Sequence, residues 1–195
     1  MKLKFCGISH LQDAITASKL GADLLGFITE PGLLRYVKPE FLTLVRRRVE
    51  KPIVAVKTSL KFDDVAGIAD IVQVHKVLTP REIEELSTLS LRFFLYVPSS
   101  REGLDYLKHV NKLTNAVPLI DSAVKGRMAD LEYAKKILDE RPDAGLGGGV
   151  TPDNVHEFVK LNPAWIDVSS GIESIPTKKD ESKMRRIAEV VKGWT

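Results

Sequence analysis

LQDAITASKLGADLLGFI, residues 11 to 28, contains a helix and a strand in direct succession. The first ten residues place apolar side chains on one face at helical spacing, and Gly21 follows them as a residue that commonly ends a helix. The next seven are apolar almost without interruption, which indicates a strand buried on both faces. The stretch therefore predicts a helix that packs against a parallel sheet.

The same unit recurs along the chain. Apolar, β-rich runs alternate with stretches of helical period, and the runs begin about 23 residues apart, which is the length of a compact strand and helix unit. The eight predicted strands are Leu3 to Ile8, Ala22 to Ile28, Pro52 to Val56, Asp70 to His75, Leu91 to Val97, Val117 to Asp121, Ala144 to Gly147 and Ala164 to Val168.

Three of the predicted helices carry a start signal. Ser9 to Gln12 and Thr79 to Glu82 have the spacing of a capping box, and Thr151-Pro152 has a capping residue followed by proline. Each signal follows the end of a predicted strand, so we expect a helix to begin at each of these points.

Eight such units can close into a (β/α)8 TIM barrel or form an open, doubly wound sheet. An open sheet that binds a dinucleotide carries G-x-G-x-x-G after its first strand, whereas Cys6-Gly7-Ile8-Ser9-His10 stands there in this chain. The chain has 195 residues, near the lower limit for the barrel. We predict an α/β fold consisting of a single, compact (β/α)8 barrel with short loops over residues 1–195.

Composition narrows the functional classes. The chain is 44% hydrophobic and 28% charged, and its 29 basic and 26 acidic residues give a net charge of +3 that is spread along the sequence. We therefore expect no nucleic-acid or membrane partner and a cytoplasmic location. Cys6 is the only cysteine, which excludes an internal disulfide, and no spacing of ligands suggests a metal. These features leave the oligomeric state open.

Two candidate catalytic groups close predicted strands, at the end of a barrel where active sites are built. Cys6 ends the first strand, and there it is either a small buried apolar residue or a reactive thiol beside Gly7. Asp121 ends the sixth strand, where it either caps the next helix or takes part in chemistry.

Glycine clusters follow the seventh and eighth strands, Gly147-Gly148-Gly149 and Ser169-Ser170-Gly171. Taken singly, each cluster is typical of a tight turn. As a pair they occupy the loops where this fold usually binds phosphate through backbone N–H groups. Arg35 is either a surface residue or a planar donor for a carboxylate, and His75 is expected to line the site as a neutral hydrogen-bonding group.

These positions together give the sequence a resemblance to the phosphoribosylanthranilate isomerases of tryptophan biosynthesis. The opening K-x-C-G motif and the D-V-S-S-G motif near the end are the most specific features of the match. The matching segments are residues 4–8, 21–27, 35–37, 39–40, 72–75, 147–149, 152–155 and 166–173.

The resemblance implies an Amadori rearrangement of N-(5-phosphoribosyl)anthranilate, without a cofactor. Cys6 then corresponds to the general base and Asp121 to the general acid. By the same comparison, Arg35 is expected to pair with the anthranilate carboxylate. The resemblance further implies substrate contacts by His75, Asp167, Gly148, Gly149, Ser170 and Gly171, the last four at the phosphate. The expected partner is thus a small phosphorylated sugar–anthranilate substrate.

Two alternatives remain at this point. A related phosphate-binding barrel isomerase of histidine biosynthesis has similar phosphate loops, but it typically has aspartate where this chain has Cys6. The second alternative is a non-catalytic ligand-binding barrel. It is prompted by the stretch Ser122 to Leu131, which replaces a glycine-rich loop usual in the family.

Overall fold

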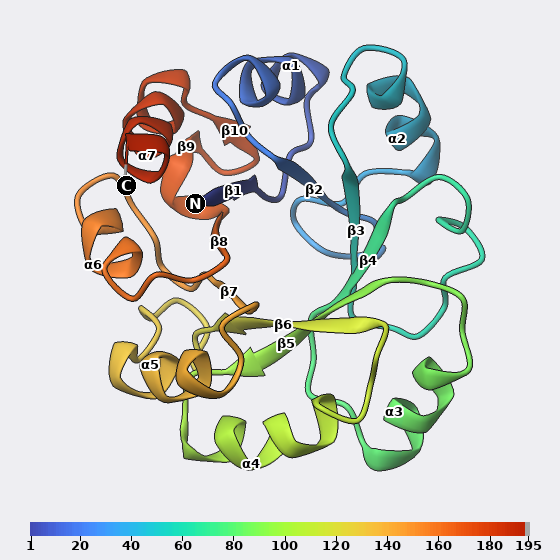
Figure 1. Cartoon of the computed structure of the whole chain (residues 1–195). Helices are drawn as coiled ribbons and strands as arrows, with labels where there is room; N and C mark the ends of the chain where they lie inside the picture. Colours follow the sequence, from blue (N-terminus) through green and yellow to red (C-terminus); the bar gives the residue numbers. More distant parts are fainter. Residues whose placement is uncertain (194–195) are drawn as a thin grey trace.

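The computed structural model describes residues 1–193, and within them eight parallel strands close into a barrel (Figure 1). Every strand pairs with the strand that follows it in sequence, and β8 closes the ring by pairing with β1. The predicted (β/α)8 barrel is therefore confirmed.

All eight predicted strands form. They are β1 (Lys2–Phe5), β2 (Leu24–Ile28), β3 (Ile53–Lys57), β4 (Ile71–Val74), β5 (Phe93–Pro98), β6 (Ala116–Asp121), β7 (Gly145–Leu146) and β8 (Trp165–Val168). The first one ends earlier than predicted, because Gly7 adopts a φ of 65° and turns the chain just after Cys6.

Helices surround the barrel in Figure 1. They are α1 (Leu11–Lys19), α2 (Pro39–Arg46), α3 (Pro80–Ser87), α4 (Arg101–Val110), α5 (Leu131–Glu140), α6 (Val155–Val159) and α7 (Glu181–Gly193). The segment between β3 and β4 forms turns instead of a helix, and there the buried side chains of Phe62 and Val65 cover the strands.

Two of the three predicted helix starts are confirmed. Thr79 and Glu82 form the capping box of α3, each bonding to the backbone of the other. Helix α1 begins at Leu11, within the predicted segment, but without a capping box, because the Ser9 hydroxyl donates to the Thr177 carbonyl, 2.8 Å away. The start predicted at Thr151-Pro152 is wrong, since α6 begins after Asn154, whose amide oxygen accepts from the Thr151 N–H.

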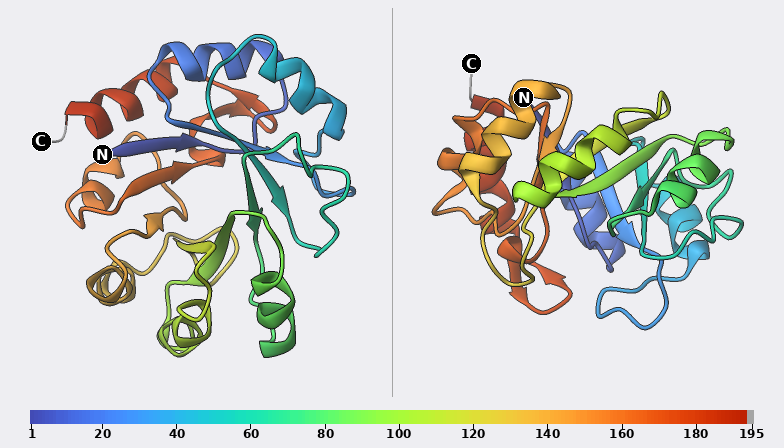
Figure 2. Two further views of the ribbon diagram at one scale, coloured as in Figure 1. Left: turned by 45° about the vertical axis from the view of Figure 1, so that its right-hand side comes forward. Right: turned by 90° about the horizontal axis from the view of Figure 1, so that it is seen from below.

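A short excursion follows β8 that the strand and helix pattern did not predict. It consists of the 3₁₀ turn η1 (Ser170–Ile172) and a hairpin of β9 (Glu173–Ile175) and β10 (Lys178–Lys179). Figure 2 shows this hairpin and the loop after β2 projecting from the same end of the barrel, away from the N-terminus. These two segments therefore extend the carboxyl-end rim of the barrel.

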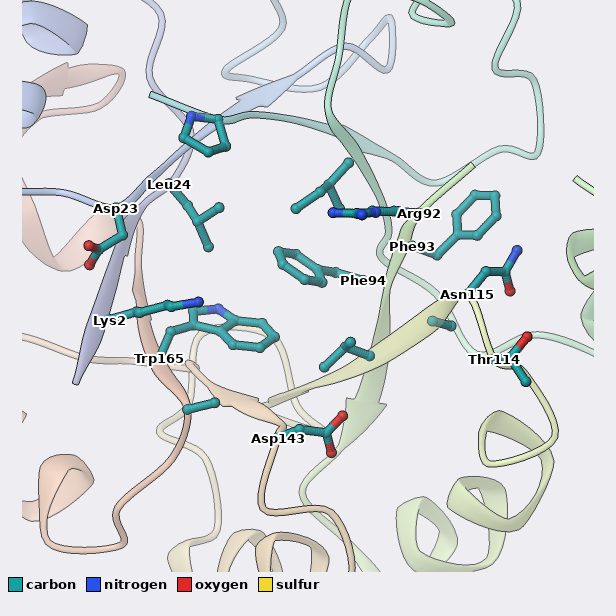
Figure 3. Close-up of a pocket in the computed structure, with 15 residues that line it drawn as sticks. Lys2, Asp23, Leu24, Arg92, Phe93, Phe94, Thr114, Asn115, Asp143 and Trp165 are labelled. Carbon is teal, nitrogen blue, oxygen red and sulfur yellow. The ribbon is translucent and has the colours of Figure 1, made fainter. Parts of the chain in front are cut away.

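The opposite end of the barrel holds a cavity of about 780 Å³ lined by the first residues of several strands. Phe94 and Trp165 stack on its wall with ring centroids 4.5 Å apart, and Leu24 lies near them (Figure 3). Asp23 and Asp143 at its edge are already ion-paired with Lys192 and Arg141. This cavity lies away from the strand ends that carry the candidate catalytic groups.

Across residues 1–193, no helix combines the length and the apolar character that a membrane span requires.

Candidate functional site

The barrel brings the sequence-predicted groups to its carboxyl end. Cys6 directly follows β1, His75 directly follows β4, and Asp121 is the last residue of β6. Parallel strands all end at the same rim, so these three side chains converge although they are far apart in sequence.

Cys6 is buried, with 6% of its surface exposed, and it lies against the backbone of β2. A Cβ atom added at Gly26 would stand 2.7 Å from the Cys6 sulfur and 3.0 Å from the Lys4 ammonium. Glycine is thus the residue that lets both groups occupy this space. Burial raises the pKa of the Cys6 thiol, and the nearby charge of Lys4 opposes that rise.

Lys4 forms a buried ion pair with Asp167 inside the barrel. The two residues are register partners on β1 and β8, and the Lys4 Nζ lies 2.8 Å from the Asp167 Oδ1. Burial lowers the pKa of Lys4, but the charges of Asp167 and Cys6 outweigh it and the net shift is upward. The ammonium therefore stays charged in the interior.

Asp121 has the environment that a general acid needs. Burial raises the pKa of its carboxyl group, the charge of His75 opposes that rise, and Asp167 adds to it. Its Oδ1 accepts a hydrogen bond of 2.6 Å from the backbone N–H of Ser122. A raised pKa lets the carboxyl keep its proton to a higher pH than usual, which is the direction that a general acid requires.

His75 is held by two neighbours that sequence reasoning left without a role. The side-chain nitrogen of Gln73 lies 3.2 Å from the His75 Nδ1, and the ring of Tyr96 lies 4.7 Å from the imidazole, centroid to centroid. Gln73 and Tyr96 thus fix the position of the imidazole at the rim.

Arg35 is already engaged within the protein. Its Nε and Nη2 donate to the two carboxylate oxygens of Glu173, at 2.6 and 2.7 Å. Lys179, completely buried, donates to Glu173 as well, at 3.2 Å. Glu173 thus fixes the orientation of the Arg35 guanidinium. The third guanidinium nitrogen, Nη1, does not take part in the contact with Glu173.

The two glycine loops adjoin each other. A Cβ at Gly171 would stand only 1.9 Å from the carbonyl oxygen of Val150, so the η1 turn packs directly against the loop after β7. Gly148 and Gly149 have φ values of 87° and 76°, a conformation that favours glycine. Among residues 1–193, the N–H groups of these two glycines donate to no backbone acceptor. These N–H groups are therefore left available as hydrogen-bond donors at the rim.

Three further residues of this region escaped the sequence-based assignment of roles. Lys4 and Glu173 lay inside the quoted motifs, but only Lys4 gave a signal, a charge within an otherwise apolar strand. Lys179 gave none, because it reaches the site through the hairpin of β9 and β10. Within the described chain, no group of three His, Cys, Asp or Glu side chains could hold a metal ion.

The fold and this rim together define a class of protein. A buried thiol, a partly buried carboxyl and two adjoining glycine loops at one end of a (β/α)8 barrel are suited to proton transfer on an anionic substrate.

Comparison with known proteins specifies the family. A family model described as N-(5'phosphoribosyl)anthranilate (PRA) isomerase matches residues 3–190, and the chain belongs to this family. An N-(5'-phosphoribosyl)anthranilate isomerase from Sulfolobus acidocaldarius is 46% identical, over 100% of this chain and 98% of the relative. The Saccharolobus solfataricus protein of the same name is 43% identical, over 98% and 96% of the two chains.

A solved structure agrees with the sequence comparison. A phosphoribosyl anthranilate isomerase in complex with reduced 1-(o-carboxyphenylamino)-1-deoxyribulose 5-phosphate superimposes with a TM-score of 0.85. It is 26% identical to this chain, and the match covers 99% of each chain. The family membership that the sequence motifs indicate is therefore confirmed.

Proposed function

We propose that this chain is an isomerase that converts N-(5'-phosphoribosyl)anthranilate to 1-(2-carboxyphenylamino)-1-deoxyribulose 5-phosphate in tryptophan biosynthesis, acting as a single barrel domain. Membership of the family supports the reaction. The observation that carries the assignment to this site is that buried Cys6 and partly buried Asp121 both stand at the carboxyl-end rim, each with a raised pKa.

The proposed reaction consists of two proton transfers by side chains, followed by a tautomerisation that moves a proton from the C2 hydroxyl to C1, and it needs no cofactor. Asp121 donates its proton to the ring oxygen of the furanose, the bond from that oxygen to C1 breaks, and the anilino nitrogen forms an iminium with C1. The thiolate of Cys6 then removes the proton on C2, which the iminium has made acidic. The resulting enaminol tautomerises to the ketone, so the overall change is an isomerisation.

The remaining groups bind the two ends of the substrate. The N–H groups of Gly148, Gly149, Ser170 and Gly171 are proposed to hold the phosphate. Arg35, oriented by Glu173, is proposed to meet the anthranilate carboxylate. Asp167 and His75 are proposed to contact the sugar between these ends.

The direct test is to follow the loss of phosphoribosylanthranilate fluorescence with purified protein. Turnover of this substrate is the expected result. Turnover of a phosphoribosyl-amino imidazole in its place would favour the histidine-type isomerase. Binding of either compound without turnover would leave a non-catalytic barrel.

Inorganic phosphate is expected to bind at the glycine loops. At ten times its Kd, phosphate should stabilise the native protein by about 1.4 kcal/mol, and it should compete with substrate. Thermal unfolding with and without phosphate measures this effect. Gly148→Val is unsuitable as a test, because the φ of 87° at Gly148 would strain a valine whatever its effect on binding.

Ser170→Asp gives the sharper variant, since it places a negative charge within the proposed phosphate site. We expect it to abolish protection by phosphate. Ser174→Asp is the matched control. Ser174 is an exposed residue of β9, so this substitution adds the same negative charge outside the glycine loops. Equal protection of both variants by phosphate would show that the anion binds elsewhere.

Arg35→Ala is expected to raise KM by about 10- to 100-fold with a smaller effect on kcat. The reason is that a hydrogen bond to a charged group contributes about 1.5–3 kcal/mol, and Arg35 would contact the carboxylate in both ground and transition states. Steady-state kinetics on folded protein measures it. Arg185→Ala on the exposed face of α7 is the control, and an unchanged KM in Arg35→Ala would place the carboxylate elsewhere.

A further inference from the structure

Lys4 lies closer to the chemistry than its place inside a strand suggests. Lys4 and Cys6 are two residues apart on the chain of β1, so their side chains point to the same side, the interior of the barrel. Their ends share the space that Gly26 leaves free. The Lys4 ammonium donates to the Asp167 Oδ1 at 2.8 Å, and it lies beside the Cys6 sulfur in the space next to Gly26.

We propose that Lys4 is a positioning residue whose ammonium, held in place by Asp167, favours ionisation of Cys6 to the thiolate that the reaction uses as its base. This inference rests on the proposed function and deepens it, because it names what offsets the cost of a buried negative charge. An anionic thiolate in an apolar interior needs a cation beside it. Lys4 is completely buried, and so the charge acts with little screening by solvent.

Four charged groups face Cys6 from the surrounding elements. Lys4 on β1 and Lys179 on β10 favour the thiolate, whereas Asp167 on β8 disfavours it. The fourth is Arg35, from the loop after β2, whose pKa the charge of Cys6 helps to raise.

Two of these groups are already committed to other partners. Lys179 and Arg35 both donate to Glu173, and Lys179 bonds in addition to the carbonyl of Ser169. Lys4 is the cation whose charged end shares with the Cys6 sulfur the space beside Gly26.

The experiment is a titration of Cys6 without substrate. Cys6 is the only cysteine of the chain, so protein made with ¹³Cβ-labelled cysteine gives a single resonance that follows its ionisation. Lys4→Met removes the charge and keeps the length of the side chain. The Cys6 pKa should rise by about one pH unit or more in this variant. The acid limb of the kcat/KM profile should move upward with it.

Asp167→Asn is the matched variant, because it removes the opposite charge of the same ion pair. We expect the Cys6 pKa to fall in Asp167→Asn. A merely structural role of the pair would disturb the barrel in both variants but would not shift the titration in opposite directions. Should Lys4→Met fail to fold, the double variant with Asp167→Asn leaves no unpaired charge, and the fall in Asp167→Asn tests the inference by itself.

Unchanged Cys6 titration in folded Lys4→Met, or shifts of the same sign in both variants, would overturn the inference. The outcome is separable from that of the proposed function. Opposite shifts in a protein that does not turn over phosphoribosylanthranilate would disprove the function and leave the role of Lys4 standing. Turnover of phosphoribosylanthranilate together with an unchanged Cys6 pKa in Lys4→Met would support the function and disprove the role of Lys4.

Discussion

Cys6→Ser is expected to lower kcat by about 10²- to 10⁴-fold while the barrel stays folded. A serine hydroxyl has nearly the size of the thiol, so the packing against Gly26 is kept. It ionises far less readily, however, and the charge of Lys4 cannot make it a base at neutral pH. Single-turnover and steady-state measurements of substrate fluorescence give the loss, and circular dichroism checks the fold.

The binding of phosphate supplies the control for this variant. Backbone N–H groups of the glycine loops are proposed to hold the phosphate, and the Cys6 side chain is not among these donors. Phosphate should therefore protect Cys6→Ser from thermal unfolding as well as it protects the parent protein. Alkylation gives a second readout, because the parent should lose activity in proportion to modification of its one thiol. Near-normal turnover by Cys6→Ser with intact structure would remove the thiol from the mechanism.

The architecture was predictable because its signal is repeated. Each strand and helix unit buries its own apolar side chains, so an error at one boundary does not alter the count of eight strands. Local signals were less reliable. Ser9 has the spacing of a capping residue, but its hydroxyl bonds to the Thr177 carbonyl, which the β9–β10 hairpin brings beside it.

The site was predictable to the extent that it lies at strand ends. Cys6, His75 and Asp121 each follow or close an apolar run, and a closed barrel leaves such residues at one rim. Glu173 and Lys179 could not be assigned in the same way. Their positions depend on the hairpin after β8, where Thr177 has a φ of 76° that no strand or helix pattern encodes.

The pKa shifts of Cys6 and Asp121, the two proposed catalytic groups, determine how we expect activity to depend on pH. Burial raises the pKa of Cys6 and that of Asp121, so each group holds its proton to a higher pH than it would in water. Activity should fall as pH drops through the Cys6 pKa, because the thiolate is lost. It should also fall as pH rises through the Asp121 pKa, because the acid is lost.

Asp121→Asn is expected to lower kcat by about 10²- to 10⁴-fold, because an amide cannot donate the proton that opens the furanose ring. The change keeps the shape of the side chain and its acceptor oxygen for the Ser122 N–H, so the end of β6 stays in place. The alkaline limb of the kcat/KM profile should disappear with the carboxyl group. A pH series on parent and variant measures both effects.

Asp130→Asn is the matched control for this last variant. Asp130 precedes α5, and its carboxylate accepts from the N–H groups of Glu132 and Tyr133 as a helix cap. Asparagine caps helices nearly as well as aspartate, so stability and kcat should both be little changed. If Asp121→Asn behaves like Asp130→Asn, the carboxyl at the end of β6 acts only as a cap, and the ring oxygen must receive its proton from another group.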